Sequence, residues 1–132
     1  MAALDTNVLV RYLTADDASQ FAITKRLVRG AVGAGEALFV PITVALELEW
    51  VLRSNFEFAK DEVMATFALL LKASELSFES EGALEHALRL FAEGGADFSD
   101  CIHIALASQY GEQPLWTFDK AASHIPGAAR LA

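Results

Sequence analysis

The sequence predicts an α/β domain in which helices cover both faces of a mainly parallel sheet. Short apolar segments alternate with helical patterns along the chain, which is typical of parallel sheets. These segments are almost continuously apolar, as in strands that are buried on both faces. A length of 132 residues suits one domain over residues 1–132, and an apolar content of 54% is enough to fill its core.

The first half of the chain contains two predicted strands and four predicted helices. A very short apolar run at residues 2–4 is the first strand, and the apolar run at residues 37–40 suits a buried strand. Gly33 and Gly35 end the second helical pattern, while Pro41 lies near the start of the third, where a helix tolerates proline. The four helices are expected at residues 8–13, 16–32, 43–53 and 60–73.

The second half of the chain continues this alternation. Residues 76–78 are a weak strand, residues 114–118 an apolar strand, and residues 129–131 a candidate for the last one. One helical pattern covers residues 81–92 and another runs from residue 98 or 99 to residue 110, and each is closed by glycine. Parallel sheets of this kind bind ligands outside the carboxyl ends of their strands, so chemistry is expected at that edge.

Charge and cysteine content exclude several classes of function. Eighteen acidic and ten basic residues give a net charge of −8, so a groove that binds nucleic acid by phosphate neutralisation alone is not expected. Chemistry on a phosphodiester would need another source of positive charge, such as a metal ion. Cys101 is the single cysteine, which excludes an intramolecular disulfide and a cysteine-based zinc finger. We recognise no membrane span or signal peptide, and expect a cytoplasmic, reducing location.

Two aspartates directly follow predicted strands. Asp5 follows the run at residues 2–4, and Asp119 follows the apolar residues 115–118. Because the carboxyl ends of parallel strands meet at one edge of a sheet, we expect both side chains at that edge. Each could instead cap the next helix, since aspartate is a favoured N-cap residue. Two such acids at two strand ends favour a chemical role.

Two glutamates, Glu47 and Glu49, differ in their helical neighbours. Arg53 lies four residues after Glu49, so we interpret Glu49 as half of a solvated surface ion pair. The neighbours of Glu47 at helical spacing are mostly apolar. A carboxylate that faces an apolar surface is costly unless it is paired or binds a metal, so Glu47 is a candidate site residue. The alternative is that its side chain reaches water between apolar neighbours.

A third group of acids lies at the start of a predicted helix. Asp97 is a plausible N-cap, and Asp100 lies in the first turn of a helix that is otherwise largely apolar. His103 shares a helix face with Asp100, but a lone helical histidine is more often structural. His86 and His124 have no partner pattern, so no chemistry is assigned to the histidines.

These acids together predict a divalent metal site. Several carboxylates that converge on one edge without basic partners would repel one another. Oxygen-rich sites suit Mg²⁺ or Mn²⁺, and such an ion can orient water for in-line attack on a phosphate. The sequence contains no Ser-His-Asp or Cys-His arrangement and no glycine-rich phosphate loop.

Four segments carry these acids in a recognisable order. They are LDTNVLVRYL at 4–13, FVPITVALELEWVL at 39–52, ADFSDCIHIALA at 96–107 and LWTFDKAASHIPG at 115–127. Together they resemble the PIN-domain ribonucleases, and within them the VapC-type toxins of toxin–antitoxin pairs. The acidic residues of that family fall on Asp5, Glu47, Asp97, Asp100 and Asp119.

The resemblance implies a three-layer α/β/α sandwich around a mainly parallel sheet of four to five strands. It implies a Mg²⁺- or Mn²⁺-dependent endoribonuclease that leaves a 5′-phosphate and a 3′-hydroxyl, forms a homodimer and is blocked by a cognate antitoxin. Asp5 and Asp100 would bind the metal directly. Glu47, Asp97 and Asp119 would complete the cluster through water or by orienting the nucleophile. The resemblance leaves open whether Asp97 and Asp100 share one role at the metal site or divide it between them.

Three other functions are weighed against this one. A catalytically silent binding module on the same fold would retain every acid. A receiver-like phosphoacceptor domain would have paired acids at the first strand, whereas Asp5 has no acidic neighbour and residues 76–78 lead to Glu79. A phosphatase with an Asp-x-Asp nucleophile is opposed by Asn7, which occupies the second aspartate position.

Overall fold

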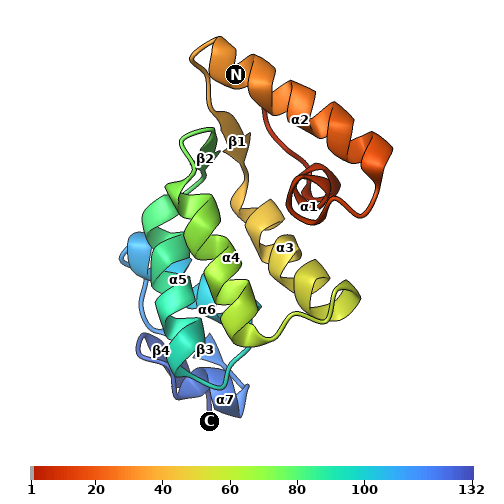
Figure 1. The fold of residues 1–132 in the computed structure, drawn as a ribbon. Coiled ribbons are helices and arrows are strands. Elements are labelled where there is room, and N and C mark those ends of the chain that lie inside the picture. Colours follow the sequence, from red (N-terminus) through yellow and green to blue (C-terminus); the bar gives the residue numbers. More distant parts are fainter. Residues whose placement is uncertain (1) are drawn as a thin grey trace. The chain divides into compact units, whose positions relative to one another are not determined.

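The computed structural model describes residues 2–132 and has an α/β fold with parallel strands (Figure 1). Its elements group into two compact units: the N-terminal unit, which runs through Glu79, and the C-terminal unit, Ser80–Ala132. Each unit contains its own helices and one two-stranded sheet. No helix among residues 2–132 is long and apolar enough to cross a lipid bilayer. That residues 1–132 form one domain stays a prediction.

Six elements form the N-terminal unit. They are α1 (Thr6–Thr14), α2 (Ala18–Gly33), β1 (Leu38–Val40), α3 (Ile42–Asn55), α4 (Lys60–Lys72) and β2 (Leu76–Phe78). α1 begins two residues earlier than predicted because Asp5 is its N-cap, with Oδ1 2.7 Å from the Thr6 amide nitrogen. α2 begins later than predicted because Asp17 caps it and accepts a hydrogen bond of 3.0 Å from the Gln20 amide.

The sheet of the N-terminal unit sets the position of the chain just before α1. β1 and β2 pair in parallel over their full length. The strand predicted at residues 2–4 forms a single parallel bridge to Phe39, and the Leu4 amide donates to the Phe39 carbonyl at 2.9 Å. This bridge fixes the backbone that leads directly into Asp5.

The core of the N-terminal unit joins α1, α3, α4 and the sheet. α3 contacts both α1 and α4, and α4 also contacts β2. Its largest fully buried side chains are Leu9, Val10, Val40, Leu48, Leu52, Val63 and Phe67. Pro41, the N-cap of α3, offers no side-chain hydrogen bond. Glu79 takes that role, because its Oε1 lies 2.8 Å from the Ile42 amide nitrogen at the positive end of the helix.

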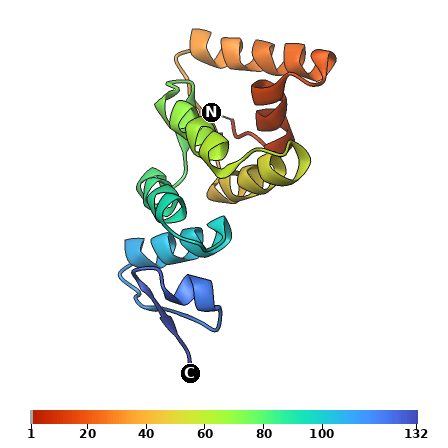
Figure 2. The ribbon, with the colours of Figure 1, turned by 60° about the horizontal axis from the view of Figure 1, so that its bottom comes forward.

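Five elements form the C-terminal unit, which is coloured from green to blue in Figure 2. They are α5 (Glu81–Glu93), α6 (Phe98–Gln109), β3 (Leu115–Thr117), α7 (Lys120–Ser123) and β4 (Ala128–Arg130). α5 packs along α6, where the rings of Phe91 and Phe98 meet edge to face with 5.3 Å between their centres. β3 and β4 pair in parallel, and α7 contacts both strands. The sequence pattern does not predict α7, because four residues are too short to show a helical period.

Residues 2–132 do not form the predicted single sheet of four to five strands. They contain two parallel sheets of two strands each, β1–β2 and β3–β4. Each strand has three residues and pairs with the next strand along the chain, across a connection that contains at least one helix. The apolar runs therefore locate the strands correctly, whereas their partners depend on packing that no short pattern records.

The substitution Gly127→Ala is expected to lower the free energy of unfolding by about 1–3 kcal/mol. Gly127 has a φ of +100°, and an added Cβ would lie 2.9 Å from Nε2 of Gln113 and 3.1 Å from Cγ2 of Ile104. Gly35→Ala is the matched control, because φ is +71° there and no atom lies within 4 Å of the added Cβ. Urea unfolding compares the two variants, and equal losses would show that the close contacts cost nothing.

Candidate carboxylate site

In the N-terminal unit, the carboxylates of Asp5 and Glu47 both accept a hydrogen bond from the same residue, Thr6. The Thr6 amide donates a hydrogen bond to Asp5, and the Thr6 hydroxyl donates to Oε1 of Glu47. The packing of α1 against α3 brings the first residue of α1 beside the second turn of α3. Thr6 is only 3% exposed, whereas both carboxylates are exposed. A buried threonine thus holds two exposed carboxylates at the start of α1.

No sequence pattern singles out Thr6 as a site residue. The available signal was its position directly after Asp5, at the start of a helix. A threonine is common at helix starts for reasons of capping alone, so this signal does not indicate a contact with α3. The contact with Glu47 joins residues 41 positions apart in the sequence.

The structure reverses the burial predicted for the two glutamates of α3. Glu47 is exposed, while Glu49 is only 3% exposed. The predicted pair of Glu49 and Arg53 does form, with Nε of Arg53 2.8 Å from Oε2 of Glu49. This ion pair is not fully solvated, because the Glu49 side chain is buried. The Arg53 side chain is half-exposed, and its guanidinium reaches the buried carboxylate. The prediction that Glu47 faces an apolar surface is therefore wrong, and the candidate role of Glu47 depends on its contact with Thr6 and on the family resemblance.

Glu49→Gln is expected to lower the free energy of unfolding by about 1–2 kcal/mol, because it weakens a charged hydrogen bond at a buried position. Arg53→Gln should give a similar loss, and the double variant should lose little more than either single variant. Glu47→Gln is the exposed control and should change stability less. Chemical denaturation of the four variants provides the comparison. Fully additive losses would contradict a coupled pair.

The C-terminal unit contains Asp97, Asp100 and Asp119. Asp97 is the N-cap of α6 and makes no side-chain cap hydrogen bond, while Asp100 lies in the first turn of the same helix. Burial raises the pKa of Asp100 above its ordinary value, and the charges of Asp119 and Asp97 raise it further, while His103 opposes the shift. Within residues 2–132, none of the three carboxylates forms an ion pair with lysine or arginine. A bound cation would relieve this repulsion.

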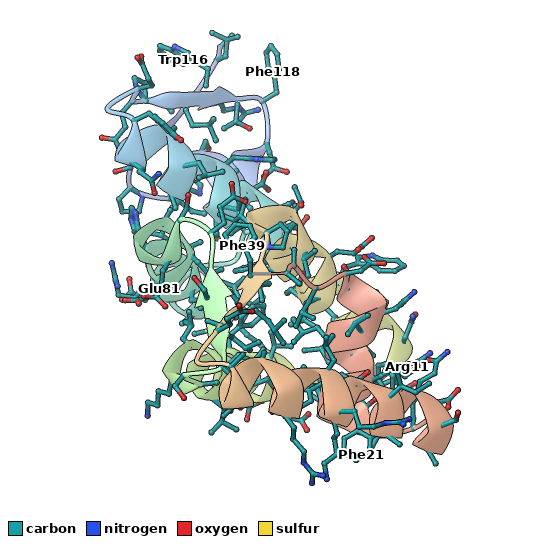
Figure 3. All side chains as sticks on the ribbon, turned by 90° about the horizontal axis from the view of Figure 1, so that it is seen from above. Arg11, Phe21, Phe39, Glu81, Trp116 and Phe118 are labelled. Carbon is teal, nitrogen blue, oxygen red and sulfur yellow. The ribbon has the colours of Figure 1, made fainter. Side chains whose placement is uncertain are left out.

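Asp119 is held at the end of β3, as predicted. Its Oδ1 lies 2.8 Å from the Ala122 amide nitrogen, and its own amide donates to Oγ1 of Thr117 at 3.0 Å. Asp119 and Asp5 therefore both cap helices, and the chemical role of the two residues stays a prediction. The aromatic side chains of Trp116 and Phe118, just before it, stand out from the ribbon and are exposed (Figure 3).

The five acidic residues divide between the two units. Asp5 and Glu47 lie in the N-terminal unit, and Asp97, Asp100 and Asp119 lie in the C-terminal unit. Among the described residues, no three His, Cys, Asp or Glu side chains lie close enough to hold a metal ion jointly. Both groups supply carboxylate oxygens, the donors that Mg²⁺ and Mn²⁺ prefer. The chemistry of the donors fits such an ion.

The fold and these carboxylates suit one class of protein, and comparison with known families identifies it. The pattern of the PIN domain family matches residues 2–128, and the chain belongs to the PIN domain family. Over 120 residues the chain is 23% identical to a protein named VapC ribonuclease from Aquifex aeolicus (strain VF5). That similarity covers 91% of this chain and 88% of the relative. The resemblance found in the sequence is thereby confirmed.

Proposed function

We propose that this protein is a Mg²⁺- or Mn²⁺-dependent endoribonuclease. Membership of the PIN domain family and the relative named VapC ribonuclease support this proposal. The observation that carries it is the setting of Asp100, which is half-buried and has a pKa raised by burial and by two neighbouring carboxylates. Such a carboxylate is stabilised by a bound cation. In a chain of net charge −8, that cation would also supply positive charge beside these carboxylates to a phosphodiester.

The proposed roles follow the chemistry of each acid. Asp5 and Asp100 are the direct metal ligands, and Glu47, Asp97 and Asp119 complete the site through water or orient the nucleophile. When bound, the divalent ion supplies positive charge to the phosphate and lowers the pKa of a water molecule. The hydrogen bond from Thr6 limits the rotamers open to Glu47. The amide of Ala122 does the same for Asp119.

The ends of the RNA fragments test this chemistry. The purified protein, supplied with Mg²⁺, should cleave a labelled RNA internally and leave a 5′-phosphate and a 3′-hydroxyl, because water is the nucleophile. Fragments that end in a 2′,3′-cyclic phosphate would contradict the proposal, since the RNA itself would then supply the nucleophile. RNA binding without cleavage would favour the catalytically silent module on the same fold.

From the resemblance of its four acidic segments to the VapC-type toxins, we propose that the protein is the toxin of a toxin–antitoxin pair and acts as a homodimer. Its partner would be a small cognate antitoxin that inserts an arginine or lysine among the carboxylates. A guanidinium suits this role because its fork can bond two carboxylate oxygens at once. Such a side chain would compete with the metal, so raised Mg²⁺ should weaken the inhibition.

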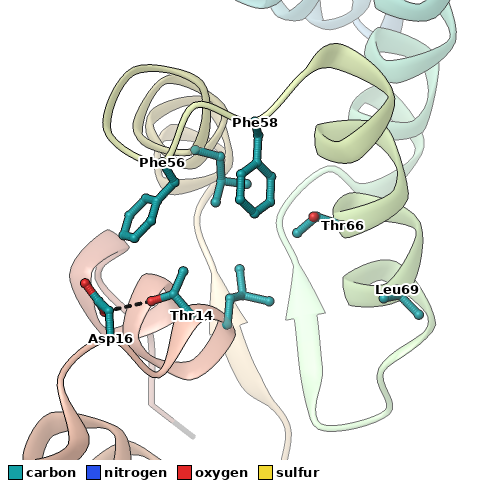
Figure 4. A pocket seen from close by; sticks show the side chains of 8 residues that line it. Thr14, Asp16, Phe56, Phe58, Thr66 and Leu69 are labelled. Carbon is teal, nitrogen blue, oxygen red and sulfur yellow. Dashed lines mark hydrogen bonds between the residues drawn. The ribbon is translucent and has the colours of Figure 1, made fainter.

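An apolar pocket of the N-terminal unit suits the same partner (Figure 4). The pocket has a volume of about 480 Å³. Its lining comes from the C-terminal ends of α1 and α3, from the segments that follow these two helices, and from α4: Leu13, Thr14, Asp16, Leu52, Phe56, Phe58, Thr66 and Leu69. The only charged group in this lining, Asp16, accepts a hydrogen bond from the Thr14 hydroxyl at 2.8 Å. We propose that apolar side chains of the antitoxin occupy this pocket.

A further inference from the structure

α2 carries the densest positive charge of an acidic chain. Lys25, Arg26 and Arg29 lie within five consecutive residues, and α2 contains no aspartate or glutamate. The helix therefore has a charge of +3, whereas the whole chain has a net charge of −8. Within residues 2–132, none of these three cations forms an ion pair. Concentrated positive charge without an acidic partner in the chain indicates an anionic ligand.

A pocket of about 410 Å³ lies beside two of these cations. It is lined by Tyr12, Lys25, Val28, Arg29, Val32, Gly33 and Glu75. Lys25 and Arg29 are one helical turn apart, about 6 Å along the axis. The Lys25 ammonium lies 5.3 Å from the centre of the Phe21 ring, which supports it against α2. The only acid of the lining, Glu75, already accepts a hydrogen bond of 3.1 Å from the Tyr12 hydroxyl.

The outer surface of α2 combines positive charge with apolar side chains. Arg26 and Arg29 are exposed, and so are Ile23, Leu27 and Val32. A second copy of this chain that docked through its own α2 would bring like charges together on such a surface. Single-stranded RNA complements this surface, because its phosphates match the cations and its bases offer flat apolar faces to the exposed aliphatic side chains.

We propose that the cationic surface of α2 binds the phosphate backbone of single-stranded RNA. The α2 surface is defined as Lys25, Arg26 and Arg29 together with the pocket beside them. This inference rests on the proposed function, since it concerns the substrate of the same enzyme. The α2 surface would offset the repulsion between RNA and a negatively charged protein, and would hold the strand by contacts independent of the five acidic residues.

The salt dependence of RNA binding tests this proposal. All proteins carry Asp100→Asn to prevent cleavage, and a fluorescent single-stranded RNA reports binding by anisotropy. The triple variant Lys25→Gln, Arg26→Gln and Arg29→Gln should bind about tenfold more weakly or worse. The slope of log affinity against log salt should fall by about 2, since each phosphate contact to a single strand contributes about 0.7. The exchanged variant Lys25→Arg, Arg26→Lys and Arg29→Lys should keep the slope.

A matched control removes three positive charges elsewhere. Lys60→Gln, Lys72→Gln and Arg89→Gln change the net charge equally and should leave the slope unchanged. An unchanged slope in the α2 variant, or the same fall in the control, would overturn the proposal. Fluorescent polyglutamate, measured in the same assay, serves as the probe for an acidic protein partner. If the α2 triple variant loses polyglutamate binding but keeps RNA binding, the proposal is overturned and an acidic protein partner is indicated. If RNA binding by the α2 surface is overturned but the wild type cleaves RNA, the proposed endoribonuclease function still holds. If the wild type neither binds nor cleaves RNA, the proposed function and the role of the α2 surface are both overturned.

Discussion

Asp100→Asn is expected to reduce RNA cleavage by about a hundredfold or more, because a metal ligand supports several kcal/mol of transition-state stabilisation. The same substitution is expected to raise thermal stability in EDTA at neutral pH. Burial and two neighbouring carboxylates raise the pKa of Asp100, so its ionised form destabilises the fold. Cleavage assays and thermal melts of the same preparation measure the two opposite effects.

The stability gain has a pH dependence that follows from the raised pKa. Well below the ordinary aspartate pKa of about 3.9, Asp100 is protonated in the folded and unfolded states, and the gain disappears. It grows as the pH rises through the folded-state pKa and persists at neutral pH. The exposed Asp61 of α4 provides the control, since Asp61→Asn should neither impair cleavage nor stabilise the protein. A loss of stability in Asp100→Asn at every pH would contradict this account.

Glu47→Gln is expected to reduce cleavage by about a hundredfold or more while the fold stays intact. Its contact with Thr6 adds a graded test. Thr6→Val removes the hydroxyl that donates to Glu47 and should lower the activity by about 10- to 100-fold, whereas Thr6→Ser should retain most of it.

Kinetics separate a positioning role of Thr6 from a purely structural one. If Thr6 positions Glu47, Thr6→Val should lower kcat with little change in KM, and it should add little to Glu47→Gln in the double variant. Glu49→Gln is the matched control on the same helix and should cleave RNA normally. Equal activity of Glu47→Gln and Glu49→Gln would refute the role assigned to Glu47.

Local patterns predict the helices of this chain well and the partners of its strands poorly. The helices expected at residues 43–53 and 60–73 are α3 and α4, because apolar periodicity and the residues that end a helix are local properties. The pairing of β1 with β2 joins segments separated by two helices. A three-residue strand contains too little pattern to specify its partner, which explains why two sheets are found where one was expected.

The candidate site shows a similar division. Asp5 and Asp119 cap helices as well as follow strand segments, so the sequence signals of a cap and of a metal ligand coincide at these positions. The burial of Glu49 instead of Glu47 depends on which side of α3 faces its neighbours, and their helical spacing alone does not decide this. The contact from Thr6 depends on the packing of α1 against α3 and could not be predicted from either segment alone.

The most direct test of the central claim is RNA cleavage as a function of the divalent ion. The wild-type protein, stripped of metal, should be inactive in excess EDTA and should recover with Mg²⁺ or Mn²⁺ but poorly with Ca²⁺, which prefers larger and more flexible oxygen sites. Asp100→Asn, purified in parallel, measures the contribution of contaminating nucleases. Full cleavage by the wild type in excess EDTA, with none by Asp100→Asn, would contradict a metal-dependent mechanism.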